Sequence, residues 1–292
     1  MRAGQRATFG LAAAALALAS ARPAHAEDDD DYRRPGLEGQ WSRRHLTAPM
    51  NSLRIIAGPG QPMLMGERFG NQIPDGGFQY LREPATGVGA ASNDAEYWFR
   101  GGVGFGLTED WEAGALFLPF QFAPHFTFSN ITVFITRGFR FKHFDFGFRY
   151  SFQTPHKDSG GGRVWDMNPS VPFLFRLGRV RLDTGVFVPF ATRDWWIGVN
   201  VPLRVSVSVT PHVFVAGESG FVVPRFEDPH RTTVPLGGML GYTALFGSKV
   251  VDFTAMFSWD SFYRPSPTDG ANSVEPGAYR VGAGIVYHSL VR

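Results

Sequence analysis

Cysteine is absent from all 292 residues of the chain, so disulfide bonds, thiolate metal sites and thiol nucleophiles are excluded. Charged residues are scarce as well, at 18% of the chain against roughly 25% in a typical soluble domain. Lysine occurs only three times, and no cluster of Lys and Arg resembles a phosphate-binding patch. With a formal net charge of +2, the chain therefore shows no sign of a nucleic-acid partner.

Long apolar runs are missing too. The mean hydropathy is only -0.12 although 43% of the residues are hydrophobic, so the apolar residues are spread along the chain. A membrane protein built of helices needs stretches of about 20 apolar residues, so that class is excluded. What the chain has instead is 15% aromatic residues, including 28 Phe, together with 35 Gly. Hydrophobicity that is dispersed in this way favours strands in which apolar and polar residues alternate.

The first residues carry the pattern of a signal peptide, which we predict over residues 1–26. Arg2 and Arg6 precede a short apolar stretch at residues 9–19, and Ala24-His25-Ala26 fits a cleavage site. The stretch is about half as long as a membrane-spanning helix. We therefore expect an exported protein, and the acidic run that follows predicts a solvated periplasmic tail over residues 27–49.

Beyond about residue 50 the dominant period of hydrophobicity is two residues, the period of a β-strand. Residues 144–152 are the clearest example, because every aromatic side chain in them falls on one face. Residues 197–209 repeat this alternation, and residues 251–260 and 279–288 follow it too. Since successive side chains of a strand point to opposite faces, each segment has one apolar face and one mixed face.

Apolar and polar residues alternate in the strands of membrane barrels and of soluble β-sandwiches alike. The length of the strands is what distinguishes the two classes. Several runs exceed the five or six residues that are about the mode in globular proteins. They match instead the roughly nine to eleven residues of a tilted membrane-crossing strand. We predict twelve strands, at about residues 50–57, 95–107, 111–118, 129–140, 144–153, 169–177, 181–190, 196–209, 212–223, 233–246, 250–260 and 277–288.

The connections between these strands alternate strictly between tight turns and longer loops. All tight turns then lie on one rim and all long loops on the other, as in bacterial outer-membrane barrels. The sheet must also close, because an unpaired backbone amide costs several kcal/mol in hydrocarbon. We therefore expect an all-β fold at residues 50–292, a transmembrane antiparallel up-and-down β-barrel of about twelve strands. Its location would be the outer membrane of a Gram-negative bacterium, with outer-membrane lipid and the barrel-insertion machinery as partners.

Two features leave alternatives open. The connector at residues 58–94 is too long to lack a role, so it is an external loop, an inward-folded plug or a hidden hairpin. A hairpin there, or one misread segment, changes the strand number to ten or fourteen. Pro202 and Pro235 fall inside predicted strands, where each removes a hydrogen-bond donor, so we expect bulges or strand ends near them.

One turn carries a family resemblance. Gly106-Leu107-Thr108-Glu109-Asp110-Trp111-Glu112-Ala113-Gly114 resembles a turn that recurs in small outer-membrane barrels, and Val209-Thr210-Pro211-His212 echoes it. The family of transporters associated with the meta-pathway of phenol degradation is one example. The resemblance implies passage of small solutes across the outer membrane. Such proteins commonly end on Phe or Trp, whereas this chain ends on Ser289-Leu290-Val291-Arg292.

The alternation places a set of charged side chains on the mixed face of the strands, which faces the barrel interior. A lining of this kind conducts water and discriminates solutes by charge. The same charges can instead pair with one another and fill the lumen, because twelve strands lie between the filled and the open barrels. The predicted pore-lining residues are Arg100, Glu112, Arg140, Arg149, Arg176, Arg204, Asp252 and Arg280.

The sequence therefore favours a passive channel or transporter for small solutes. A closed, structural envelope barrel is the first alternative. A lipid-modifying enzyme at the outer rim is the second, since His125, His156 and His230 fall in predicted external loops. None of these histidines has the spacing of a zinc motif or of a known nucleophile, so no catalytic residue, metal site or cofactor is predicted.

Overall fold

The structure is a computed structural model, and it describes residues 40–48, 50–57, 77–82, 95–123, 127–128, 131–153, 156–157, 163–192, 197–223, 226, 232–263 and 279–289. The helical element among them is a single 3-10 turn, η1 (Trp41–Arg43). Within these ranges no helix is both long enough and apolar enough to cross a membrane.

Strands make up almost all of the described chain. In chain order they are β1 (Leu53–Ala57), β2 (Gly77–Arg82), β3 (Ala95–Gly106), β4 (Trp111–Ala123), β5 (Thr127–Phe128), β6 (Ile131–Arg140), β7 (Phe144–Gln153), β8 (His156–Lys157), β9 (Arg163–Val164), β10 (Asp166–Leu177), β11 (Val180–Phe187), β12 (Phe190–Ala191), β13 (Val199–Ser208), β14 (Val213–Val223), β15 (Val234–Phe246), β16 (Lys249–Tyr263) and β17 (Tyr279–Ser289).

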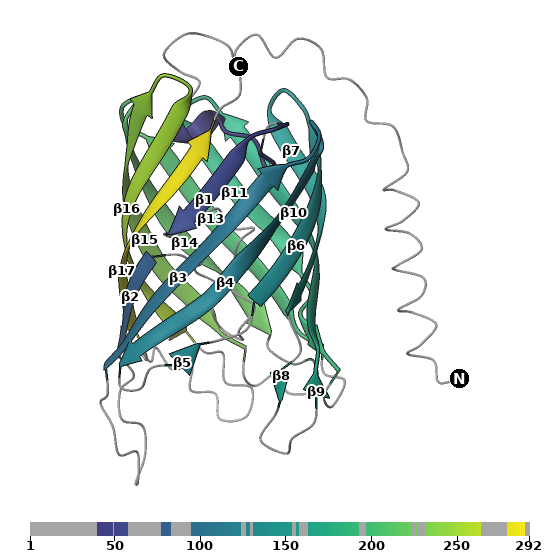
Figure 1. The fold of residues 1–292 in the computed structure, drawn as a ribbon. Coiled ribbons are helices and arrows are strands. Elements are labelled where there is room, and N and C mark those ends of the chain that lie inside the picture. The colour runs from purple at the N-terminus through teal and green to yellow at the C-terminus, as the bar shows by residue number, and fades with distance from the viewer. Residues whose placement is uncertain are drawn as a thin grey trace.

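These strands close into an antiparallel barrel (Figure 1). Around the ring, the position shared by β1 and β2 is followed by β3, β4, β6, β7, β10, β11, β13, β14, β15, β16 and β17. The ring closes because β17 pairs with both β1 and β2. The short strands β5, β8, β9 and β12 stand outside this ring. The predicted all-β up-and-down barrel of twelve strands is confirmed.

The first strand of the ring consists of two pieces. β1 pairs with the ends of β3 and β17 nearest the short turns, from Leu53 opposite Phe105 to Ala57 opposite Ile285. β2 pairs with the other ends of the same two strands. β2 lies inside the predicted connector, so part of that connector completes the first strand, and the strand number stays at twelve. Its other residues, 58–76 and 83–94, lie outside the described residues.

The five tight turns lie on one rim, between β3 and β4, β6 and β7, β10 and β11, β13 and β14, and β15 and β16 (Figure 1, top). The two turns that resemble each other in sequence share a structure. The Thr108 hydroxyl accepts from the backbone N–H groups of Asp110 and Trp111, at 3.3 and 3.1 Å. The Thr210 hydroxyl accepts from those of His212 and Val213, at 3.2 and 2.9 Å. A threonine side chain therefore stabilises each turn.

The prolines disturb the ladder in different ways. Pro235 lies at a register shift of β15 against β16, so the ladder is irregular there, as expected. Pro202 continues the pairing of β13 with β14, opposite Gly220. On its other side, against β11, Leu203 and Asn200 are paired but Pro202 is not. The missing N–H therefore interrupts one ladder of the barrel while the other continues.

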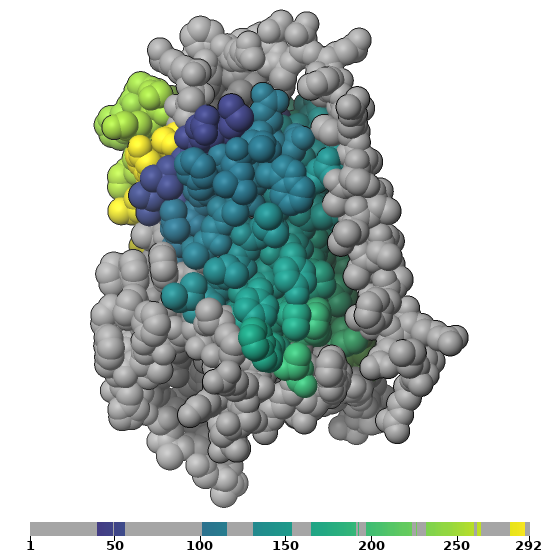
Figure 2. Space-filling model, turned by 45° about the vertical axis from the view of Figure 1, so that its right-hand side comes forward, coloured from purple at the N-terminus to yellow at the C-terminus, as the bar shows by residue number. Residues whose placement is uncertain are grey.

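Alternation along the strands sorts the side chains between the two faces of the wall. In β7, Asp145, Gly147, Arg149, Ser151 and Gln153 are buried inside, while the aromatic residues between them point outward. Figure 2 shows one side of the outer wall. The wall carries a wide belt of exposed apolar side chains: Ile55, Phe105, Val133, Ile135, Tyr150, Val186, Leu203, Val205, Val207, Val215, Leu236, Leu240, Tyr242, Phe253, Val281 and Ile285.

A belt of this extent has a physical consequence. Soluble monomers rarely expose contiguous apolar patches larger than a few hundred Å². An outward apolar band around a closed barrel is instead what a lipid environment requires.

Candidate functional site

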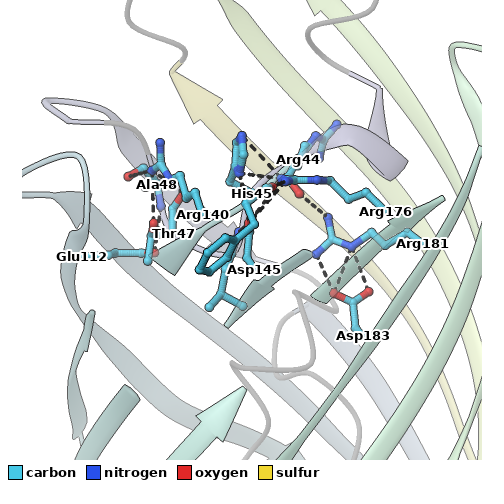
Figure 3. A network of polar contacts seen from close by, with 12 residues as sticks. Arg44, His45, Thr47, Ala48, Glu112, Arg140, Asp145, Arg176, Arg181 and Asp183 are labelled. Carbon is cyan, nitrogen blue, oxygen red and sulfur yellow. Dashed lines mark hydrogen bonds and ion pairs between the residues drawn. The ribbon is translucent and has the colours of Figure 1, made fainter. Parts of the chain in front are cut away.

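The interior of the barrel near the short-turn rim is occupied by residues 40–48, here called the luminal segment. Apart from Arg43, which is half-buried, its side chains are nearly inaccessible, with exposed fractions from 0% at Ser42 to 9% at His45. A turn at Asn51, whose φ is 58°, leads the chain from the lumen into β1. The backbone N–H of Asn51 donates to the carbonyl of Gly106 at 2.8 Å. The sequence analysis groups residues 40–48 with the periplasmic tail, and the structure places them inside the barrel (Figure 3).

At its first end the luminal segment packs on β13 and β14. The Trp41 ring stacks on Phe214 with 4.4 Å between the ring centroids, and its indole N–H donates to the Ser206 hydroxyl at 3.1 Å. Gly241 makes room for this stack, because a Cβ there would lie 2.0 Å from the Phe214 ring. Trp41 is therefore an apolar anchor with a satisfied polar edge.

Two buried arginines continue the attachment. Arg181 pairs with Asp183 at 2.7 Å and donates to the backbone carbonyls of Trp41 and Arg44, at 3.1 and 3.3 Å. Arg44, which belongs to the luminal segment, forms an ion pair with Asp252 of β16. The Thr243 hydroxyl donates to the same carboxylate at 2.7 Å. The charges of both arginines are thus neutralised inside the wall, as buried charges require.

Asp145 of β7 holds the middle of the luminal segment. Its carboxylate accepts from the backbone N–H of Leu46 at 2.9 Å and lies 3.0 Å from Nδ1 of His45. Arg176 of β10 completes the group, with its guanidinium 3.0 Å from the same carboxylate. One acidic side chain therefore joins two strands of the wall to the segment that crosses the lumen.

The last residues of the segment contact β4 and β6. Glu112 accepts from the backbone N–H of Ala48 at 3.0 Å and forms an ion pair with Arg54 of β1. Arg140 donates to the Thr47 hydroxyl at 3.1 Å. Since β4 stands six places from β14 in the ring of twelve, the segment crosses the lumen from one wall to the opposite one.

Glycines on the inner wall shape the place where the segment lies. A Cβ at Gly138 of β6 would lie 2.7 Å from the Thr47 methyl group, and one at Gly147 of β7 would lie 2.8 Å from Leu46. The two glycines are direct partners across the β6–β7 ladder. Together they form a depression in the wall that Leu46 and Thr47 fill.

The predicted pore-lining residues divide into three groups. Glu112, Arg140, Arg176 and Asp252 surround the luminal segment, as described above. Arg149 and Arg204 point inward at positions further from the short turns, and they have their own neighbours. The Arg149 guanidinium lies 3.9 Å from the centroid of the Phe134 ring, and Arg204 pairs with Glu218. Nothing is described of the side chains of Arg100 and Arg280, so their positions stay predictions.

Sequence reasoning missed Arg181 and Asp183 as well as the segment itself. The sequence of β11 does contain a signal for Arg181 and Asp183, because alternation places both on the same inward face of the strand as Phe187. The luminal segment offers a weaker signal, namely Trp41 and Leu46 within an otherwise polar stretch. Its partners are distant in sequence, and Arg44 lies 208 residues from Asp252. No local pattern reports contacts of that range.

The described residues contain no group of three or more His, Cys, Asp and Glu that could hold a metal ion. The histidines that raised the enzyme alternative fall outside what the structure describes. His125 and His230 are not described at all, and of His156 only its backbone in β8 is described. The described interior is instead a set of paired charges and short hydroxyl side chains.

No family model matches this chain, and no curated protein matches its sequence. Solved structures do. An outer-membrane channel from Pseudomonas putida F1 is 12% identical, with a TM-score of 0.51, over 88% of this chain and 98% of that chain. An anion-selective porin from Comamonas acidovorans is 10% identical, over 81% and 98% of the two chains, with a TM-score of 0.35. A bacterial polysaccharide outer-membrane secretin is 9% identical, over 84% and 100%, with a TM-score of 0.39.

These comparisons do not identify the phenol-degradation family, so that resemblance stays a prediction. At 12% identity the likeness to the channel from Pseudomonas putida F1 concerns the fold alone. This chain has the barrel fold of an outer-membrane channel.

Proposed function

We propose that this chain is an outer-membrane channel for small solutes, and that the luminal segment closes its short-turn rim in the present conformation. One observation carries the proposal: the same closed wall has an apolar belt outside and charged and polar side chains inside. The outside suits lipid tails, and the inside suits water and polar solutes.

The chemistry of the inner wall supports passage more than simple filling. Replacing a buried ion pair with well-packed apolar residues is often neutral or stabilising, so ion pairs are a costly way to fill a barrel. This interior nevertheless keeps several of them, such as those that join Arg44 to Asp252 and Arg204 to Glu218. Water that enters the lumen can solvate these charges when the luminal segment moves.

Passage through the rim requires the luminal segment to leave its place between β14 and β4. Its attachments are one aromatic stack, ion pairs and hydrogen bonds. Most of these contacts involve a charged partner, and each is exchanged for water at a net cost of about 1.5–3 kcal/mol. The segment can therefore act as a plug that moves, in a wall that stays closed.

The other parts of the proposal follow from the barrel. Residues 1–26 would direct export as a cleaved signal peptide, and the barrel-insertion machinery would place residues 50–292 in the outer membrane of a Gram-negative bacterium. Arg149 and the ion pair of Arg204 with Glu218 would line the passage beyond the plug, so permeating solutes would meet charged side chains there. The solute is a small molecule that this lining tolerates.

A closed structural barrel is the second candidate, and the filled short-turn rim favours it. The two candidates differ in an experiment on the full mature chain, reconstituted in liposomes and in planar bilayers. A channel gives liposome swelling with small sugars or amino acids and discrete conductance steps. A structural barrel gives neither, and it stays silent when Arg44→Ala weakens the attachment of the luminal segment.

A further inference from the structure

Basic side chains lie at four of the five short turns. Lys142 and His143 form the tip between β6 and β7, and Arg179 lies between β10 and β11. His212 lies between β13 and β14, and Lys249 begins β16. All five side chains are exposed, and two of the three lysines of the chain are among them. Lys142, Arg179 and Lys249, which we call the rim cations, therefore lie at the tips of three of these turns, and a histidine lies at the fourth.

The four turns with basic side chains form one uninterrupted arc. They are consecutive around the ring, because the strand order runs β6, β7, β10, β11, β13, β14, β15, β16. Lys142, Arg179 and Lys249 form no ion pair with any residue that the structure describes. The fifth turn, between β3 and β4, differs from the others and carries Glu109 and Asp110. The charge on this rim is thus divided into a long basic arc and a short acidic break.

Each of the three rim cations has a large apolar neighbour that points out of the wall. Leu177 precedes Arg179 and is 62% exposed, and Phe246 precedes Lys249 with the same exposed fraction. Across the first turn of the arc, Phe141 and Phe144 stack with 4.5 Å between ring centroids. Outward apolar groups beside an arc of cations suit the boundary between the acyl chains and the headgroups of a membrane.

We propose that the rim cations bind the anionic phosphate groups of the phospholipid leaflet on the short-turn side. The inference rests on the proposed placement of the barrel in a membrane. A lipid surface fits better than a soluble acidic partner, because the cations are spread along the circumference beside outward apolar groups. A leaflet surrounds the barrel there and contacts both kinds of group at once. The arc then fixes which rim faces this leaflet and how deeply the barrel lies in it.

The expected effect follows from the attraction of basic residues to anionic membranes. Each Lys or Arg near such a surface favours the bound state about fivefold. The attraction fades over a Debye length of about 10 Å at 0.1 M salt, so high salt reduces it. Lys142, Arg179 and Lys249 together should favour anionic over zwitterionic membranes about a hundredfold.

The test measures folding equilibria of the full mature chain in urea, with two kinds of vesicle. One kind is pure phosphatidylcholine, and the other contains 30% phosphatidylglycerol as the anionic probe. For each variant, the ratio of the two folding equilibrium constants reports the preference for anionic lipid. The variants are Lys142→Gln, Lys249→Gln and the triple replacement that adds Arg179→Gln. The matched control is Lys157→Gln in β8, which removes the third lysine of the chain near the other rim (Figure 1).

We expect each single rim replacement to lower the ratio about fivefold, and the triple replacement to remove most of it. Lys157→Gln should leave the ratio at the parent value, and 0.5 M salt should reduce the parent ratio toward one. The proposal is overturned if the triple variant keeps the parent ratio, a result that would favour a soluble acidic partner for the arc. It is equally overturned if Lys157→Gln lowers the ratio as much as Lys142→Gln. Failure of the parent to fold into either vesicle would instead refute the membrane placement on which the proposed function depends.

Discussion

A single added methyl group at Gly138 should displace the luminal segment while leaving the wall intact. A Cβ there would lie 2.7 Å from Cγ2 and 3.0 Å from Oγ1 of Thr47. The next atom is the Thr47 Cβ at 3.5 Å, an ordinary van der Waals distance. All three nearest atoms belong to Thr47, so Gly138→Ala acts on the luminal segment alone.

The magnitude follows from the cost of overpacking. An extra carbon forced into a well-packed site costs about 1–3 kcal/mol. If this cost falls on the closed state, the population with the segment displaced rises roughly 5- to 150-fold. Thr47→Ala removes both close atoms and leaves the one at 3.5 Å, so it relieves the clash. Alone, Thr47→Ala loses the hydrogen bond from the Arg140 guanidinium, worth about 1.5–3 kcal/mol, and opens the channel roughly 10- to 150-fold.

The assay is the open probability of single channels in planar bilayers for the parent, both single variants and the double variant. The double variant should conduct like Thr47→Ala alone. The difference between its free energy of opening and the sum for the two single variants measures the contact between the two residues. Gly217→Ala on the outward face of β14 is the control, because nothing lies within 4 Å of its added Cβ. The reasoning fails if folded Gly138→Ala stays as closed as the parent, or if the double variant opens by the full sum.

Three further outcomes are expected. Trp41→Ala removes the stack on Phe214 and should raise liposome swelling with small sugars, whereas unchanged swelling would show that the anchor does not hold the plug. Arg149→Gln removes an inward cation and should shift the reversal potential in a KCl gradient toward cation preference, and an unshifted potential would place Arg149 outside the ion path. Asp145→Asn leaves buried Arg176 without its carboxylate and should cost about 3–5 kcal/mol, read as a lower urea midpoint for unfolding from vesicles; an unchanged midpoint would contradict the role of this carboxylate.

The barrel itself could be predicted from alternation, because each strand reports its own two faces locally. The predicted strand at residues 144–153 coincides with β7, and its aromatic face does point outward. The predicted strand at residues 277–288 differs from β17 by only a few residues at its ends. Strand ends are less exact because the pairing partner decides where the ladder stops.

The split first strand could not be predicted in the same way. β1 lies within the strand predicted at residues 50–57, whereas β2 has only six residues inside the long connector, too few to be distinguished from a loop by alternation. What makes them one position in the ring is that each pairs with both β3 and β17. That pairing depends on the closed barrel and leaves no trace in the local pattern.

The candidate site shows the same limit. The inward parity of Glu112, Arg176 and Asp252 follows from the strands that carry them. That these charges surround a segment of the chain, and not an empty passage, depends on the positions of Arg44 and His45. Those two residues lie before the first strand, where no period constrains them.

The most direct test of the account uses a disulfide bond as a lock. The chain has no cysteine of its own, and a Cβ at Gly138 would lie 3.5 Å from that of Thr47, within the range for a disulfide. The measurement is the single-channel conductance of Thr47→Cys/Gly138→Cys before and after reduction. The account predicts closed channels while the bond is intact, and conductance that appears on reduction and disappears on reoxidation. Equal conductance in the oxidised and reduced states, with the bond verified by mass spectrometry, would contradict it.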